Sequence, residues 1–257
     1  MSDFILVHGA AQGGWCWHKV KGILEGKGHT VYTPDLPGHE PQSILQPHEI
    51  TFDLYVKKIL DTLSEASGNV ILVGHSMGGA VITKVIDILG GKKIKKAVFV
   101  SGFIPEDGEI IGELLKTDTG SELKECFEIN PDKMSVRLLP ESIGRIIYNG
   151  CSDEDIEYAK MRVVSQSVIP IGTPIRLSNP ISIPRVGIVC TMDKSLTSEM
   201  QEMFYRRAGC EIRYLESGHA PFFFRPFELV QILLEKDCIQ SPIPDLINKN
   251  KNESARA

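Results

Sequence analysis

Apolar residues along this chain alternate between two patterns. Short, nearly continuous apolar runs, such as residues 4–7 and 97–100, are typical of strands buried on both faces. Between them, apolar residues recur every three to four positions, most clearly over residues 52–63, as on one face of a helix. The expected strands are 4–7, 30–33, 70–73, 97–100, 186–191 and 211–215, and the expected helices are 15–27, 52–63, 78–89, 198–208 and 226–236. Strands and helices in alternation predict an α/β fold with a mostly parallel central sheet and helices on both faces.

The pattern changes between residues 103 and 184. No run of four or more strand-forming residues occurs there, and short helix-like pieces are separated by prolines and glycines. We therefore predict a single core domain formed by residues 1–102 and 185–240, with residues 103–184 as a mainly helical cap or lid insertion. An insertion after a sheet strand would cover the carboxyl edge of the sheet. Residues 241–257 are polar and are expected to form a disordered tail.

Composition and charge exclude several classes of function. The 257 residues are 42% hydrophobic and 24% charged with a net charge of −5, which is typical of a soluble globular protein and argues against a nucleic-acid partner. No apolar stretch approaches the ~20 residues of a membrane span, and the amino terminus has no signal-peptide pattern, so no membrane association and a cytoplasmic location are expected. The six cysteines are scattered, which predicts reduced thiols and no metal site. Nothing in the sequence indicates an oligomeric state.

The clearest candidate for chemistry is the segment from Gly74 to Gly78, Gly-His-Ser-Met-Gly. It follows an apolar strand and precedes a helical pattern, which is the context that a G-x-S-x-G nucleophile elbow requires. In this motif the serine occupies a strained turn and points out of the sheet. Ser76 is therefore the predicted nucleophile.

A serine hydroxyl needs a base and a group that orients the base. In this architecture the chain order is serine, acid, histidine. His219 is the only histidine after Ser76, and it follows the last expected strand. Asp193, at the end of the preceding strand, is the predicted acid, and Asp107, after the strand that ends at residue 100, is the alternative.

An oxyanion intermediate needs two hydrogen-bond donors. The residue after the nucleophile supplies one backbone N–H, which here belongs to Met77. The glycine-rich loop after the first strand supplies the second, and the Ala10 N–H is the candidate. This arrangement needs neither a metal nor an organic cofactor.

These motifs resemble the α/β-hydrolase superfamily over nearly the whole chain. Residues 7–10 and 13–17 are similar to the opening segment of plant methylesterases, and residues 185–194 resemble the acid-bearing strand of that group. Residues 168–174 and 217–223 resemble bacterial pyrethroid-hydrolysing carboxylesterases. The resemblance implies the α/β-hydrolase fold and favours Asp193 over Asp107.

The same group includes hydroxynitrile lyases, and the chain departs from them. Those enzymes carry a threonine in place of Gly9, a glutamate in place of His75 and a lysine in place of Ala220. Dehalogenases and epoxide hydrolases would carry an aspartate in place of Ser76. The expected function is that of a serine carboxylesterase acting on small to medium esters through an acyl-enzyme. The alternatives are a lyase or other non-hydrolytic triad enzyme and a ligand-binding receptor on a hydrolase scaffold.

Overall fold

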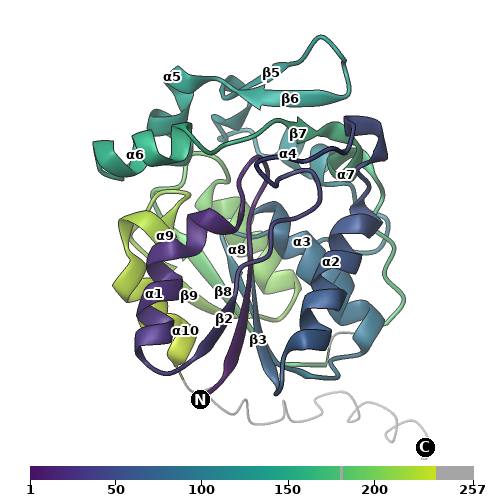
Figure 1. Ribbon diagram of the computed structural model, residues 1–257, viewed down its shortest axis with the longest axis vertical. Coiled ribbons are helices and arrows are strands. Elements are labelled where there is room, and N and C mark those ends of the chain that lie inside the picture. Colours follow the sequence, from purple (N-terminus) through teal and green to yellow (C-terminus); the bar gives the residue numbers. More distant parts are fainter. Residues whose placement is uncertain (180–181, 236–257) are drawn as a thin grey trace, which may run out of the picture.

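The computed structural model describes residues 1–179 and 182–235, and its centre is a parallel sheet of six strands (Figure 1). Their order across the sheet is β2-β1-β3-β4-β8-β9, and every neighbouring pair is parallel. The strands are β1 (Asp3–Val7), β2 (Thr30–Tyr32), β3 (Val70–His75), β4 (Ile94–Val100), β8 (Arg185–Cys190) and β9 (Glu211–Leu215). The predicted fold class is confirmed, and each strand overlaps an expected one.

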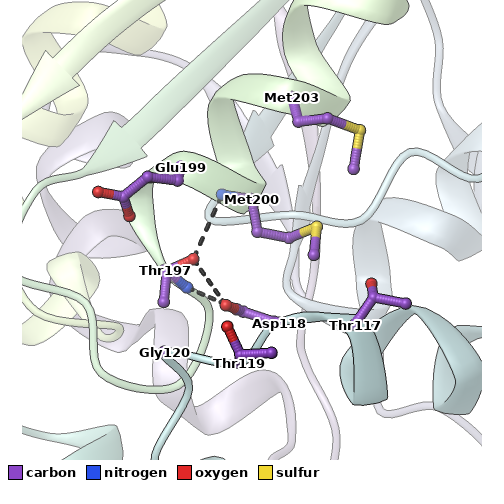
Figure 2. Close-up of a pocket in the computed structure, with 8 residues that line it drawn as sticks. All are labelled: Thr117, Asp118, Thr119, Gly120, Thr197, Glu199, Met200 and Met203. Atoms are coloured by element: carbon purple, nitrogen blue, oxygen red, sulfur yellow. Dashed lines mark hydrogen bonds between the residues drawn. The ribbon is translucent and has the colours of Figure 1, made fainter.

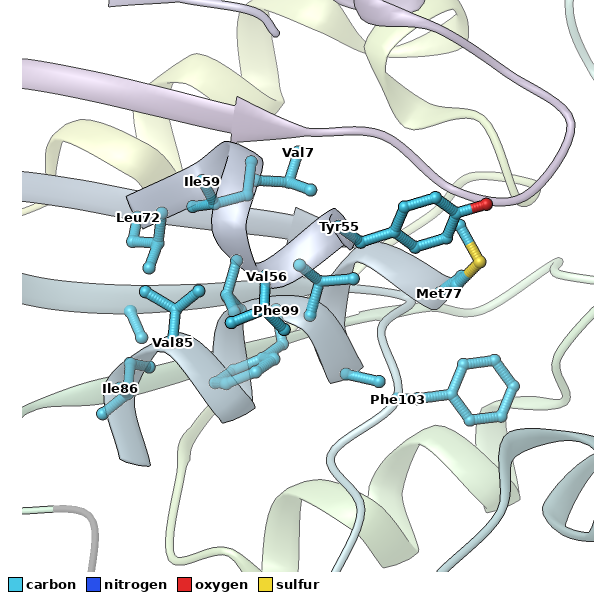
Figure 3. Packing of buried hydrophobic residues seen from close by; sticks show 14 of the residues in the cluster. Val7, Tyr55, Val56, Ile59, Leu72, Met77, Val85, Ile86, Phe99 and Phe103 are labelled. Carbon is cyan, nitrogen blue, oxygen red and sulfur yellow. The ribbon is translucent and has the colours of Figure 1, made fainter. Parts of the chain in front are cut away.

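Alternate residues of each strand pack against helices on opposite faces of the sheet. Ile5, Leu72 and Phe99 contribute to a core that also contains buried residues of α2 (Phe52–Glu65), α3 (Met77–Leu89) and α8 (Ser198–Arg207). Figure 3 shows Val7, Leu72 and Phe99 packed among side chains of α2 and α3.

The second face carries Leu6 and Val73 together with α1 (His18–Gly26), α9 (Pro221–Phe224) and α10 (Pro226–Leu234). In Figure 1 α1 and α10 lie on one side of the sheet and α2 and α3 on the other. Each fully buried aliphatic or aromatic side chain contributes about 1.5–3 kcal/mol, so both faces of the sheet are needed to stabilise the fold.

Local sequence determines where several helices begin and end. Thr51 and Thr197 lie directly before α2 and α8, and their hydroxyl oxygens accept hydrogen bonds from the N–H groups of Leu54 and Met200 (both 3.3 Å). Helix α3 ends at Leu89 and is followed by Gly90, whose φ of 57° is accessible to glycine at little cost.

Most of the chain between β4 and β8 lies beyond the carboxyl ends of the strands, and its last residues return along α3 to the start of β8 (Figure 1). Its helical elements are α4 (Ile111–Thr117), η3 (Leu123–Glu125), α5 (Pro140–Ser142), the π-helical η4 (Ile143–Ile147), α6 (Asp153–Lys160) and α7 (Val168–Gly172). It also contains a three-stranded antiparallel sheet of β5 (Phe127–Ile129), β6 (Ser135–Leu138) and β7 (Gln166–Ser167), which the sequence did not predict. These strands have four residues or fewer, too few for a readable alternation. We call residues 103–184 the cap segment below.

Two single-turn elements complete the described fold, η1 (Gly14–Trp17) and η2 (Pro47–Glu49). Among the described residues, no helix is long and apolar enough to cross a membrane. The five cysteines within this part of the chain are unpaired, and three of them are fully buried or nearly so. The predicted tail, residues 241–257, lies outside the described residues.

Candidate active site

Ser76 occupies the junction between β3 and α3. Its backbone has φ 51° and ψ −122°, a conformation that is rare for a residue with a side chain. The Ser76 N–H donates to the carbonyl of Val100 on the neighbouring strand (3.3 Å), and its own carbonyl accepts from Gly79 (2.9 Å) and Phe103 (3.1 Å). These hydrogen bonds hold the strained residue between strand and helix.

Gly74 and Gly78 allow the strand and helix to approach closely around Ser76. A Cβ atom on Gly78 would lie 2.6 Å from the Val7 carbonyl oxygen and 2.7 Å from that of His8. A Cβ atom on Gly74 would lie 2.6 Å from the Gly78 carbonyl oxygen. Because backbone atoms form these contacts, no side-chain rotation can relieve them.

Gly78→Ala is therefore expected to destabilise the protein by about 1–3 kcal/mol, the usual cost of forcing an extra methyl group into a packed site. Gly22→Ala in α1 is the matched control, because no atom lies within 4 Å of the Cβ position there. The control should stabilise the helix by about 0.5–1 kcal/mol. Urea unfolding of both variants measures the difference, and equal effects would contradict this interpretation.

Asp193 and His219 follow β8 and β9 and are hydrogen-bonded to each other. His219 Nδ1 lies 2.7 Å from Asp193 Oδ2, and both residues are buried. Since a carboxylate can only accept a hydrogen bond, Nδ1 carries the proton and donates it. Nε2 of neutral His219 is then unprotonated, which is the form that a general base requires.

The Asp193 carboxylate is held from several directions. Its Oδ1 accepts hydrogen bonds from the backbone N–H groups of Ser195 (2.7 Å) and Leu196 (3.0 Å). Its Oδ2 accepts from the Gln201 side-chain amide (3.1 Å) and from the Ser101 hydroxyl. Gln201 lies on α8 and Ser101 directly follows β4, so these two elements and the loop after β8 fix the carboxylate.

The alternative acid, Asp107, lies elsewhere. Its side chain is exposed and accepts a hydrogen bond from the Leu177 N–H (2.9 Å), within the cap segment. Asp193 is thus the carboxylate that the structure brings to His219.

His75 holds the main chain of His219. Its Nε2–H donates to the His219 carbonyl oxygen (2.8 Å), and the two rings lie 4.6 Å apart between centroids. Burial, reinforced by the neighbouring His219, keeps the pKa of His75 well below its usual value, so the ring is neutral. The His75 side chain therefore restrains the backbone of His219.

The loop that contains Ala10 lies directly against Ser76. A Cβ atom on Gly9 would be 2.9 Å from Ser76 Cβ, so only a glycine permits this approach. The N–H of Gly9 donates to Gln12 Oε1 (3.3 Å), and that of Ala11 donates to Gln166 Oε1 (3.1 Å). Within the described part of the chain, the Ala10 N–H between them has no acceptor, and neither has the N–H of Met77 at the start of α3.

Two buried side-chain amides that the sequence did not single out hold this loop. Gln166, on β7 of the cap segment, also accepts from His39 Nε2 (2.9 Å) and donates to the Tyr55 hydroxyl (3.1 Å). The Gln12 amide donates to the Tyr148 hydroxyl (3.0 Å). No local pattern marks these residues, because Gln12 and Tyr148 are 136 positions apart and meet only in the folded chain.

The cap segment also holds the loop that carries Asp193. Backbone carbonyls of residues 192, 194 and 195 accept hydrogen bonds from Asn149 (2.8 Å), Glu122 (2.8 Å) and Ser121 (2.7 Å) respectively. Figure 2 shows Asp118, at the end of α4, accepting hydrogen bonds from Thr197, next to a surface hollow of about 480 Å³. Neither Ser76, Asp193 nor His219 lines this hollow. The cap segment thus positions both the oxyanion-loop candidate and the acid.

Three buried histidines lie around the site, and burial is the largest of the effects that lower the pKa of each. These are His8, His39 and His75. His8 donates through Nδ1 to the Gly9 carbonyl (2.8 Å) and accepts from the Leu36 N–H through Nε2 (3.0 Å), which requires a neutral ring.

Their depressed pKa values predict a loss of stability in mild acid. Below about pH 6.5 histidines of the unfolded chain take up protons that the folded chain excludes, so the unfolded state is favoured. Three such groups give a slope of up to about 4 kcal/mol per pH unit below that pH, while stability near neutrality is unaffected by them. Urea unfolding at pH 7.5, 6.5 and 5.5 checks this, and a flat profile would contradict it.

Comparison with known proteins places this chain in a family. The model of the family described as "Alpha/beta hydrolase family" matches residues 4–232. The chain belongs to the alpha/beta hydrolase family.

Within the described residues, no group of three or more His, Cys, Asp or Glu side chains is arranged to hold a metal ion.

The relatives confirm the resemblance to plant methylesterases, and a pyrethroid hydrolase shares the fold. Methylesterase 7 of Arabidopsis thaliana is 32% identical over 253 residues, covering 90% of this chain and 95% of its own. Norfluorocurarine synthase 2 of a Strychnos species is 28% identical over 260 residues, covering 90% and 94%. The crystal structure of a pyrethroid hydrolase from Sphingobium faniae superposes with a TM-score of 0.79 at 23% identity, covering 90% and 95%, which shows a shared fold.

Proposed function

We propose that this protein is a serine carboxylesterase that hydrolyses small to medium carboxylic esters. The observation that carries the proposal is the hydrogen bond from His219 Nδ1 to the buried Asp193 carboxylate, at the sheet edge where Ser76 lies at the start of α3. An imidazole oriented in this way has its other nitrogen available as a base. Similarity to a methylesterase over nine-tenths of both chains supports an ester as the substrate.

The proposed reaction has two halves. Ser76 Oγ attacks the ester carbonyl carbon while His219 Nε2 takes the hydroxyl proton. The tetrahedral intermediate collapses, the C–O bond to the alcohol breaks, and His219 returns the proton to the leaving oxygen. Water then attacks the acyl-Ser76 ester, with His219 again as base, and releases the acid and the free serine.

The N–H groups of Ala10 and Met77 are the proposed oxyanion donors. Both lack another acceptor within the described part of the chain, while the amides on either side of Ala10 are engaged. Met77 N–H also lies at the positive end of the α3 dipole. Donors fixed before the reaction stabilise the developing negative charge without reorganisation.

Apolar side chains adjoin the proposed site, so we expect substrates with an apolar part. Met77 belongs to a buried apolar cluster with Phe103 and Ile111, and Figure 3 shows Met77 and Phe103 beyond the carboxyl ends of the strands. Partly buried Leu114 and Ile171 of the cap segment pack against the same cluster. The cap segment therefore contributes to substrate selection in this proposal.

A non-hydrolytic reaction is the second candidate, because one relative is named a synthase. Parallel assays with p-nitrophenyl acetate, a panel of methyl and longer-chain esters, and a cyanohydrin distinguish the two. The proposal predicts ester turnover and no cyanohydrin cleavage. Cyanohydrin cleavage without ester hydrolysis would support the lyase alternative, and tight ester binding without turnover would support a receptor.

A further inference from the structure

The four neighbouring strands β3, β4, β8 and β9 are each followed by a polar residue that lies at or beside the candidate site. Ser76 follows β3, Asp193 lies beyond β8 and His219 beyond β9, while Ser101 follows β4 between them. The register pairs His75 with Val100, which places Ser76 and Ser101 side by side. The Ser101 N–H donates to the Ile188 carbonyl of β8 (3.1 Å), so its position in the sheet is fixed.

The Ser101 side chain lies between the acid and the histidine. Its hydroxyl donates to Asp193 Oδ2, and its oxygen is 3.1 Å from His219 Nδ1. The same Asp193 oxygen accepts the Nδ1–H of His219. A hydroxyl that donates to the carboxylate directs its lone pairs away from it, and one of them can share the Nδ1 proton.

The backbone of Ser101 gives a second, independent indication. Its φ is 43°, a region that favours glycine, and the next residue in the chain is Gly102. Ser101 is fully buried. A glycine would adopt this backbone with less strain, and what serine adds is the hydroxymethyl group that contacts Asp193 and His219. Strain of this kind persists where the surroundings impose it and is concentrated at functional sites.

We propose that Ser101 is a positioning residue that holds the Asp193–His219 pair. It restrains Asp193 Oδ2 and gives the Nδ1–H of His219 a second acceptor, which keeps the proton on Nδ1 and leaves Nε2 free. It touches neither the substrate nor the reacting atoms. The proposal rests on the triad mechanism of the proposed function.

Two variants test the role of the Ser101 hydroxyl, so that the test does not depend on the folding of a single variant. Ser101→Ala and Ser101→Gly both remove it, and glycine also accepts the positive φ, so Ser101→Gly should be the more stable of the two variants. Both are expected to lower kcat for p-nitrophenyl acetate by about tenfold, as for loss of a hydrogen bond to a charged group, with KM within about twofold of wild type. An unchanged kcat in a folded Ser101→Gly variant would overturn the proposal, as would a change confined to KM.

A double-mutant cycle separates positioning from a general structural role. Because Ser101 acts through Asp193, adding Ser101→Gly to Asp193→Ala should cost less than about a further twofold in kcat. A full tenfold additional loss would overturn the proposal. Ser76→Ala is assayed alongside: if it retains turnover, the triad mechanism fails and this proposal fails with it. If Ser76→Ala is inactive and the Ser101 variants are unaffected, only the role of Ser101 is refuted.

Discussion

Replacing Ser76 by alanine is expected to lower kcat/KM for p-nitrophenyl acetate by a factor of about 10⁴ to 10⁶. The variant keeps the Ala10 and Met77 amides and the Asp193–His219 hydrogen bond but has no atom that can form the acyl-enzyme. Binding of the ester should persist, because the cap segment and the apolar cluster are unchanged. Initial rates with purified wild type and variant, corrected for spontaneous hydrolysis, measure the effect.

Ser64→Ala is a matched control for this substitution. Ser64 is exposed on α2, and its hydroxyl donates to the Asp61 carbonyl. We expect wild-type rates from it, while circular dichroism should show both variants folded. Retention of more than a few per cent of the activity by Ser76→Ala would mean that another residue is the nucleophile.

Asp193→Asn is expected to lower kcat by about 10⁴, through the tautomer of His219 rather than through loss of packing. The amide oxygen must occupy the Oδ1 position, since the fixed N–H groups of Ser195 and Leu196 point there. The NH₂ group then takes the place of Oδ2 and donates to His219 Nδ1. The histidine proton is forced onto Nε2, which can no longer accept a proton from Ser76.

Asp107→Asn is the control for this second variant and decides between the two carboxylates considered from the sequence. Its side chain is exposed and contacts Leu177, so its activity should stay within about twofold of wild type, as expected for a surface substitution. The comparison is made on kcat at saturating ester. A large loss in Asp107→Asn with normal activity in Asp193→Asn would reverse the assignment of the acid.

The four central strands of the sheet were predictable because they are buried on both faces. Continuous apolar runs at residues 4–7, 70–73 and 97–100 are needed when helices cover both sides, so the sequence itself marks these strands. The cap segment was predictable only as a change of pattern. Its strands β5 to β7 are short and partly exposed, and Gln166 and Ser167 on β7 are polar although buried, so neither length nor hydrophobicity marks them.

The candidate site likewise contains residues that the sequence could predict and residues that it could not. Ser76 and Asp193 follow apolar strands, and His219 follows the last strand, in a fixed chain order, so local context was sufficient to propose them. Ser101 also follows an apolar strand, but its importance depends on β4 lying between β3 and β8, which local sequence does not reveal. The hydrogen-bond partners of Gln12 and Gln166 lie far along the chain, so the roles of these two residues could be recognised only from the structure.

The central claim, that Ser76 is an activated nucleophile, is tested most directly by covalent labelling with diethyl p-nitrophenyl phosphate. The phosphorus centre reacts with an activated serine and releases p-nitrophenol, and the resulting diethylphosphoryl ester is stable enough for mass spectrometry. The account predicts one diethylphosphoryl group per chain, located on Ser76, together with complete loss of ester hydrolysis. Labelling of a different residue, or continued hydrolysis by fully labelled protein, would contradict it.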